Sequence, residues 1–159
     1  MSRLESMRRR LTAQIDGLNW AISQVADVEG DFLDLGLGNG RTYDHLREYA
    51  PERRIWVIDR VLKSHPSCIP PEADFLLGEA EPMLTRLADG QARIALAHYD
   101  FGYGVKEEDV AEGARLSPYI AKVTVPGAMI VSQQPLVGFA QITGPDTIDP
   151  ERYLFYRNT

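Results

Sequence analysis

The sequence predicts an α/β protein: a doubly wound, mostly parallel sheet between two helical layers, closed by an antiparallel hairpin. Three observations support this three-layer α/β/α prediction. Short runs rich in aliphatic and aromatic residues alternate with longer segments of helical periodicity. The first run leads into a loop with glycine at every second position. The last two runs, at 137–143 and 153–156, lie too close together for a crossover helix and therefore read as a hairpin.

Length and composition suit one domain over residues 1–159, with an N-terminal helix at 1–28 and a core at 30–159. Of the 159 residues, 44% are hydrophobic and 25% charged, which is ordinary for a soluble globular protein. The formal net charge of −6 argues against nucleic-acid partners, because phosphate binding depends on Lys and Arg. No run approaches a membrane span, and Cys68 is the only cysteine, so we expect no membrane association and a cytoplasmic location.

The helix predicted at 1–28 carries one apolar stripe. The members that recur every seven residues are Leu4, Leu11, Leu18 and Val25. Two interpretations stay open: the stripe packs on the sheet, or it forms a subunit contact in a homo-oligomer. The run Arg8-Arg9-Arg10 falls largely off the stripe and is interpreted as a solvated helix face.

The other elements follow in the order of an open parallel sheet. Strands are predicted at 31–35, 54–59, 74–77, 94–99 and 128–132. Helices are predicted at 42–49, 81–88 and 107–123. Pro118 should kink or interrupt the last helix, and Pro126-Gly127 should form a turn before the fifth strand. The proline-rich segment 60–71 is predicted to be a loop with a short turn.

The glycine loop has the features of a nucleotide cradle. Gly36, Gly38 and Gly40 lack a Cβ, so the chain can turn sharply and let a ligand approach the backbone. The helix that follows would point free N–H groups into the loop. Asp59 ends the second strand, 25 residues after Asp34, a distance that suits an acid binding ribose hydroxyls.

Two details distinguish this loop from a dinucleotide site. In the G-x-G-x-x-G pattern the third glycine comes one residue later than Gly40 does, and here that place holds Arg41. Asp34 stands just before the first glycine, where a carboxylate repels a pyrophosphate but attracts a ligand with ammonium and sulfonium groups. S-adenosylmethionine is such a ligand.

At this point the sequence resembles the class I, Rossmann-like S-adenosylmethionine-dependent methyltransferases. Five features resemble that family in order: Asp34-Leu35-Gly36-Leu37-Gly38-Asn39-Gly40, Asp59, Gly78-Glu79-Ala80, Val125-Pro126-Gly127-Ala128 and the reversed last strand. The resemblance covers residues 30–157. A short second crossover and the absence of a last helix suggest a small, trimmed member.

The resemblance implies S-adenosylmethionine as cofactor and assigns its contacts. Asp34 and the Gly36 backbone would hold the methionine amino group, and Asp59 the ribose. Arg60 or Val61 would cover one face of the adenine, and Glu79 or Ala80 would reach its edge. The full set of implied cofactor-binding residues is Asp34, Gly36, Leu37, Gly38, Gly40, Asp59, Arg60, Val61, Glu79 and Ala80.

Methyl transfer from a sulfonium depends mainly on in-line alignment, so few catalytic side chains are needed. Asp100 and His98 are the candidate proton acceptors at the end of the fourth strand, although His98 also suits a hydrogen-bonded strand histidine. No Asp-Asn pair follows Asp100 and Glu107, so we expect no metal. The segment 98–101 lacks the Asn-Pro-Pro-aromatic signature of base or amide N-methylation.

The sequence thus predicts methyl transfer to an unidentified small-molecule acceptor. Two alternatives stay open: a non-catalytic S-adenosylmethionine-binding module, and an NAD-dependent oxidoreductase, which the early third glycine disfavours. In this fold, substrate contacts usually come from segments that correspond to 1–28, 99–105 and 133–137. These segments are short, so a neighbouring subunit could complete the pocket.

Overall fold

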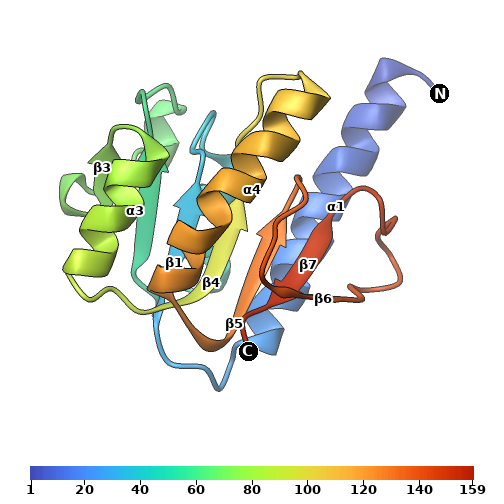
Figure 1. Ribbon diagram of the computed structural model, residues 1–159. Coiled ribbons are helices and arrows are strands. Elements are labelled where there is room, and N and C mark those ends of the chain that lie inside the picture. The colour runs from blue at the N-terminus through green and yellow to red at the C-terminus, as the bar shows by residue number, and fades with distance from the viewer.

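A computed structural model describes residues 1–159 and shows one seven-stranded sheet between two layers of helices (Figure 1). The strands are β1 (Asp31–Leu35), β2 (Ile55–Asp59), β3 (Phe75–Leu77), β4 (Ile94–Tyr99), β5 (Thr124–Ser132), β6 (Ala140–Ile142) and β7 (Leu154–Arg157). The helices are α1 (Arg3–Gln24), α2 (Arg41–Tyr49), α3 (Ala80–Asp89) and α4 (Lys106–Val123), with 3-10 turns η1 (Pro66–Cys68) and η2 (Glu72–Asp74) between β2 and β3. The predicted fold class is confirmed.

The strand order in the sheet is β3-β2-β1-β4-β5-β7-β6. Strands β1 to β5 are parallel, and β7 pairs antiparallel with both β5 and β6, so the closing hairpin is confirmed. The chain progresses in one direction from β1 to β3 and in the other from β4 onward. A ligand crevice is expected where this order reverses, at the carboxyl ends of β1 and β4.

Each face of the sheet buries the side chains of two helices. Along β1 the side chains alternate: Phe32 packs in the cluster that holds Leu18 of α1, and Leu33 packs in the cluster that holds Leu84 of α3 and Ile120 of α4. Helices α1 and α2 therefore cover one face, and α3 and α4 cover the other (Figure 1).

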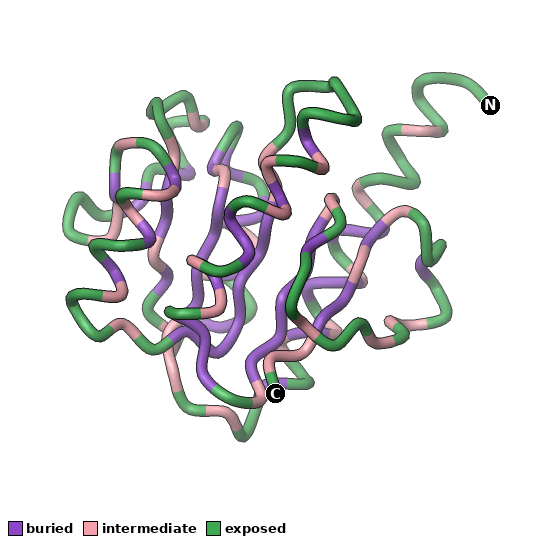
Figure 2. Tube along the Cα trace, in the orientation of Figure 1, coloured by how far each residue is buried: buried purple, intermediate pink, exposed green.

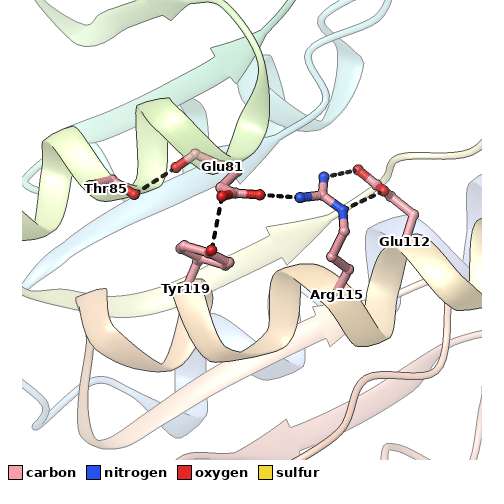
Figure 3. A network of polar contacts seen from close by, with 5 residues as sticks. All are labelled: Glu81, Thr85, Glu112, Arg115 and Tyr119. Atoms are coloured by element: carbon pink, nitrogen blue, oxygen red, sulfur yellow. Dashed lines mark hydrogen bonds and ion pairs between the residues drawn. The ribbon is translucent and has the colours of Figure 1, made fainter.

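Helices α3 and α4 are also joined at their surface (Figure 3). Glu81 of α3 accepts a hydrogen bond from the Tyr119 hydroxyl at 2.8 Å and forms an ion pair with Arg115. Arg115 in turn donates to Glu112 within α4. Because the charged groups of this network are largely exposed, the network adds little to the stability of the fold.

Helix α1 has two unlike halves. A capping box between Ser2 and Glu5 begins the helix, and residues 1–10 are exposed apart from Ser6 (Figure 2). Leu4 is 81% exposed, whereas Leu18 is 1% exposed and packs on the sheet. The apolar stripe thus docks on the sheet only in the C-terminal half of α1.

The C-terminal end of α1 is held by the side chain of one arginine. Arg53 donates hydrogen bonds to the carbonyl oxygens of Val25, Val28 and Gly30 at 2.9, 2.8 and 2.7 Å. Val25 is the C-cap residue of α1, and Val28 and Gly30 lie in the segment between α1 and β1. Arg53 therefore ties the end of α1 to the turn before β2.

Two local predictions were wrong. Helix α4 continues through Pro118, so the expected interruption is wrong, whereas a kink at Pro118 stays a prediction. The predicted turn at Pro126-Gly127 lies inside β5, where the register against β4 shifts and Gly127 has a φ of +85°. The extra backbone is accommodated as an irregularity within a longer strand. No helix of the chain has both the length and the apolar character needed to cross a membrane.

Candidate functional site

The carboxyl ends of β1, β2 and β4 border a cavity of about 550 Å³, here called the carboxyl-edge cavity. Its volume is in the range of small-molecule sites. Its wall contains Gly36, Leu37, Gly38, Asn39, Gly40, Arg41, Thr42, Asp59, Arg60, Asp100, Phe101, Gly102, Tyr103, Gly104 and Asp109, together with Met7, Arg10, Leu11, Gln14, Gln133 and Gln134. The cavity therefore joins the glycine loop to the first helix and to the segments after β4 and β5.

The glycine loop is closely packed at two of its glycines. A Cβ on Gly36 would lie 2.6 Å from the Asp100 carbonyl oxygen, and one on Gly40 would lie 2.5 Å from the Cβ of Cys68. Both residues also have a positive φ, +95° and +92°. Around Gly38, by contrast, nothing lies within 4 Å of the Cβ position. The middle of the loop thus leaves open space that a ligand can fill.

Asp59 lies at the rim of the cavity and contacts the loop directly. Its two carboxylate oxygens accept hydrogen bonds from the backbone N–H groups of Gly38, at 3.1 Å, and Arg60, at 2.7 Å. These bonds orient the carboxylate beside the open part of the loop. Each oxygen keeps a further lone pair for a ligand hydroxyl.

Asp34 and His98 lie beneath the loop, outside the cavity wall. Both side chains are fully buried. The Asp34 carboxylate accepts a hydrogen bond from the Thr42 hydroxyl at 3.2 Å, and its other oxygen is 2.9 Å from His98 Nδ1. His98 Nε2 is 2.8 Å from the Tyr153 hydroxyl. This buried network joins β1, α2, β4 and the residue before β7.

The partners of His98 in this network raise the pKa of its imidazole. Burial acts to lower its pKa, but Tyr153 and then the Asp34 carboxylate outweigh burial and raise the pKa to about 10. A buried, protonated imidazole with both nitrogens engaged has no free acceptor for a proton. The geometry therefore favours a structural role for His98 over the predicted role as a base.

Asp100 is the candidate proton acceptor that borders the cavity. Burial raises the pKa of its carboxyl; His98 opposes this, Asp34 adds to it, and Arg10 opposes it. Its Oδ2 atom is 4.0 Å from the Arg10 guanidinium. A carboxylate with a raised pKa inside a cavity is a better proton acceptor than an exposed one.

Hydrogen bonds to one buried side chain hold the loop that follows β4 at the wall of the cavity. The buried carboxylate of Asp109 accepts hydrogen bonds from the N–H groups of Tyr103, at 2.8 Å, and Gly104, at 3.2 Å. The Arg60 guanidinium lies 4.9 Å from the centre of the Tyr103 ring. These contacts position aromatic side chains beside Asp59 and Asp100. No group of three or more His, Cys, Asp or Glu side chains is arranged to hold a metal ion.

The remaining predicted cofactor residues, Val61, Glu79 and Ala80, are outside the cavity wall, although Glu79 is 3.9 Å from Arg60. Sequence reasoning missed the polar residues that α1 contributes. Arg10 and Gln14 were placed off the apolar stripe, yet they line the cavity. Their spacing from Met7 and Leu11, at positions 7, 10, 11 and 14, is that of one helix face and was the available signal.

Comparison with known proteins shows the family to which the chain belongs. A family model described as S-adenosyl-L-methionine methyltransferase matches residues 1–158. The chain belongs to this family. The enzyme is therefore an S-adenosyl-L-methionine-dependent methyltransferase, and the comparisons give no support to the oxidoreductase or to the non-catalytic binding module. No curated protein matches the chain.

Solved structures agree with this assignment. The methyltransferase is similar to an S-adenosyl-L-methionine methyl transferase from Silicibacter pomeroyi DSS-3, with 32% identity and a TM-score of 0.93 over 100% of this chain and 99% of that one. Human methyltransferase-like protein 13 in complex with SAH shares the fold at 11% identity and a TM-score of 0.57, over 93% and 80% of the two chains. TrmN from Thermus thermophilus shares it at 17% identity and 0.60, over 96% and 53%.

The cavity residues fit the family's cofactor. The loop is open at Gly38, a carboxylate stands at its rim, and the Gly36 and Gly40 positions admit no side chain. Such a loop suits close backbone approach to a ligand that carries a ribose.

Proposed function

We propose that the methyltransferase binds S-adenosyl-L-methionine in the carboxyl-edge cavity and methylates a small-molecule acceptor there, with Asp100 as proton acceptor. One observation carries the proposal: the open glycine loop, Asp59 and Asp100 come from three different strand ends and line one cavity. When bound, the cofactor supplies a methyl group on a sulfonium, which is transferred to the acceptor.

The cofactor would be held mainly by backbone and by Asp59. Gly36, Leu37, Gly38 and Gly40 form the cradle, and Asp59 accepts hydrogen bonds from the ribose hydroxyls. Asp34 has both carboxylate oxygens engaged beneath the loop, so it supports the cradle rather than contacting the amino group directly. Arg60, with its neighbours Val61, Glu79 and Ala80, is proposed to form the adenine side of the site.

Asp100 would receive the proton that the acceptor loses. The cofactor, held by the glycine loop and Asp59, would supply the methyl group and keep the carbon–sulfur electron pair, and the Asp100 carboxylate would take the proton of the acceptor atom. Arg10 lies close enough to orient that carboxylate. Alignment of the two reactants in one site can contribute about 7–11 kcal/mol to a transfer reaction. Asp100 is therefore needed only to accept the proton.

A small acceptor suits the size of the cavity and the shortness of the segments around it. The net charge of −6 gives no support for a nucleic-acid acceptor. We further propose a homo-oligomer through α1, supported by exposed Leu4, Met7 and Ile15. A single cysteine, Cys68, supports a cytoplasmic location. Light scattering of wild type and Leu4→Glu tests the oligomer: loss of the larger species supports it, and a wild-type monomer contradicts it.

Titration calorimetry with SAH tests the cofactor site. Asp59→Ala should weaken binding, whereas Asp89→Ala, which removes a carboxylate outside the cavity wall, should not. Asp100→Asn should retain SAH binding but lower kcat about 10²- to 10⁴-fold in a screen for SAH production with candidate metabolites. Absence of SAH binding to the wild type would contradict the proposal, as would equal loss of binding in both alanine variants.

A further inference from the structure

A second cavity, of about 560 Å³, adjoins the carboxyl-edge cavity. It lies between the exposed half of α1 and the segment before β7, and Arg10 and Gln133 line both cavities. We call it the arginine cleft, because Arg9, Arg10 and Arg152 stand in its wall. The two cavities thus share part of their walls, at Arg10 and Gln133, and Arg10 pairs with Asp100 of the carboxyl-edge cavity.

The three arginines differ in how far they are neutralised. Arg9 is paired with Asp149 at 3.4 Å. Arg10 has only Asp100, at 4.0 Å. Arg152 forms no ion pair and instead donates from Nη2 to the Ser6 carbonyl at 2.8 Å. Two guanidinium groups therefore keep positive charge available in a chain whose net charge is −6.

Arg152 is oriented by its contact with Ser6, not neutralised by it. A guanidinium has five N–H donors, and a single bond to a carbonyl leaves most of them free. The planar fork matches carboxylate and phosphate groups, which accept two parallel hydrogen bonds. Gln133 adds a further donor: its Nε2 atom is buried and has no hydrogen-bond partner. Gln133 and Arg10 line both cavities, and Arg152 stands in the wall of the arginine cleft.

The acids of the cleft do not cancel this charge. Asp149 is occupied by Arg9, and Glu151 is exposed at the rim. A neutral acceptor would leave Arg152 without an anionic partner and Arg10 with only the Asp100 contact at 4.0 Å. A cationic acceptor would meet two like charges, which are repulsive at short range. An anionic group satisfies the free donors and the charge together.

We propose that the arginine cleft binds an anionic group of the methyl acceptor, a carboxylate or a phosphate, through Arg10 and Arg152. The acceptor would then extend past Gln133 into the carboxyl-edge cavity, where its reactive atom meets Asp100. This proposal rests on the assignment of the cofactor to the carboxyl-edge cavity. It makes the acceptor an acid or a phosphorylated metabolite, and Arg152 a determinant of that choice.

The test uses the wild-type protein saturated with SAH, so that the cofactor region is filled. Sodium malonate and inorganic phosphate are titrated at constant ionic strength against sodium chloride, and NMR follows the arginine Nε–Hε signals. Both anions are expected to shift the signals of Arg10 and Arg152 beyond the chloride effect. The anion that binds with the higher affinity identifies the class, carboxylate or phosphate, to which the acceptor belongs.

Variants separate this binding from general charge effects. Arg152→Gln should weaken anion binding about tenfold or more, the size expected for a lost charged hydrogen-bonding pair. Arg3→Gln makes the same charge change at the start of α1, in neither cavity wall, and should leave anion binding unchanged. Arg152→Lys keeps the charge without the fork and should fall between them. It also serves as the second variant if Arg152→Gln does not fold.

Shifts no larger than those with chloride would overturn the proposal. So would equal weakening in the Arg152 and Arg3 variants. A parallel SAH titration keeps the two assignments apart. If SAH binds and the anions do not, the arginine cleft is wrong and the cofactor site stands. If SAH does not bind to the wild type, the cofactor assignment itself fails.

Discussion

The two faces of the sheet are covered alike, by two helices each, but they bury different chemistry. Under α1 and α2, the fully buried Asp34 and His98 form an ion pair inside an otherwise apolar core. Under α3 and α4 no ion pair is buried: the ion pairs of Glu81 and Arg115 lie at the surface of the helices (Figure 3), and the buried carboxylate of Asp109 accepts hydrogen bonds from backbone N–H groups. One face thus buries an ion pair, and the other keeps its ion pairs at the surface.

The difference follows the position of the site. The buried pair joins segments 64 residues apart and extends through a hydrogen bond to Tyr153, so it fixes β1, β4 and the start of β7 directly below the glycine loop. A buried ion pair gives little net stability, because desolvation offsets attraction. Its use here is to hold the loop in one arrangement, a task that the opposite face does not have.

His98→Leu should produce the largest loss, because it leaves the Asp34 carboxylate buried without its partner. We expect the free energy of unfolding to fall by about 3–5 kcal/mol. SAH affinity should fall as well, since the glycine loop rests on this pair. Urea unfolding and SAH calorimetry measure the two effects. A loss of stability below about 1 kcal/mol, the usual size for an exposed pair, would contradict the comparison.

Leu84→Ala makes a hole in the opposite face. Leu84 is fully buried, so we expect a loss of about 2–5 kcal/mol from missing contacts and the cavity left behind. SAH affinity should stay at the wild-type value at temperatures where the variant is folded. The same two measurements apply, and a parallel fall in SAH affinity would show that the faces do not differ as described.

The pH dependence of stability should reveal the charge on His98. Its pKa is raised to about 10 in the folded chain, where Asp34, Asp100 and Tyr153 surround it. The folded state therefore keeps a proton that the unfolded state loses above its ordinary pKa of about 6.5. The stabilisation is complete below that pH and declines as the pH rises toward 10, with a slope of at most about 1.4 kcal/mol per pH unit.

Urea unfolding of wild type, Leu84→Ala and His98→Leu between these limits gives the check. Wild type and Leu84→Ala share the ion pair and should show the same slope. The slope should be absent in His98→Leu. A wild-type slope that persists in His98→Leu would assign the titration to another group.

Arg115→Ala should have the smallest effect. Its ion pairs with Glu81 and Glu112 are solvent-exposed, and such pairs contribute about 0–1 kcal/mol. Added salt should reduce even this difference, because exposed charges are screened. A loss of several kcal/mol in urea unfolding would mean that the α3–α4 surface matters as much as the buried pair.

Most of the fold could be predicted because its strands have recognisable local sequence patterns. The runs at 31–35 and 94–99 coincide with β1 and β4, since both are short, apolar and bounded by turn residues. The misses are tertiary. A proline inside α4 and a glycine inside β5 look like breaks in the sequence. The sheet and the neighbouring helices tolerate both, which no local pattern reveals.

The sequence predicted which residues follow the strand ends and meet at the site. It did not predict which side chains are buried below the site. The loop glycines, Asp59 and Asp100 follow strands, and parallel strands bring their carboxyl ends together, so their meeting at one edge was expected. Asp34 and His98 lie within strands, where side chains alternate between faces, and both point into the core below the edge. Arg10 could not be separated from a solvated arginine, because only the packing of α1 shows which face borders the cavity.

The Arg53 contacts hold the C-terminal end of α1 in place. A helix of 22 residues is about 33 Å long, and Arg53 anchors one end through three carbonyls. The other end is held by the exposed Arg9–Asp149 pair and the Arg152–Ser6 contact. Because α1 packs on the sheet from Ala13 onward, Arg10 stands where the exposed N-terminal part of the helix begins, and it borders both cavities. A ligand that displaces Arg10 in one cavity is therefore expected to change the wall of the other.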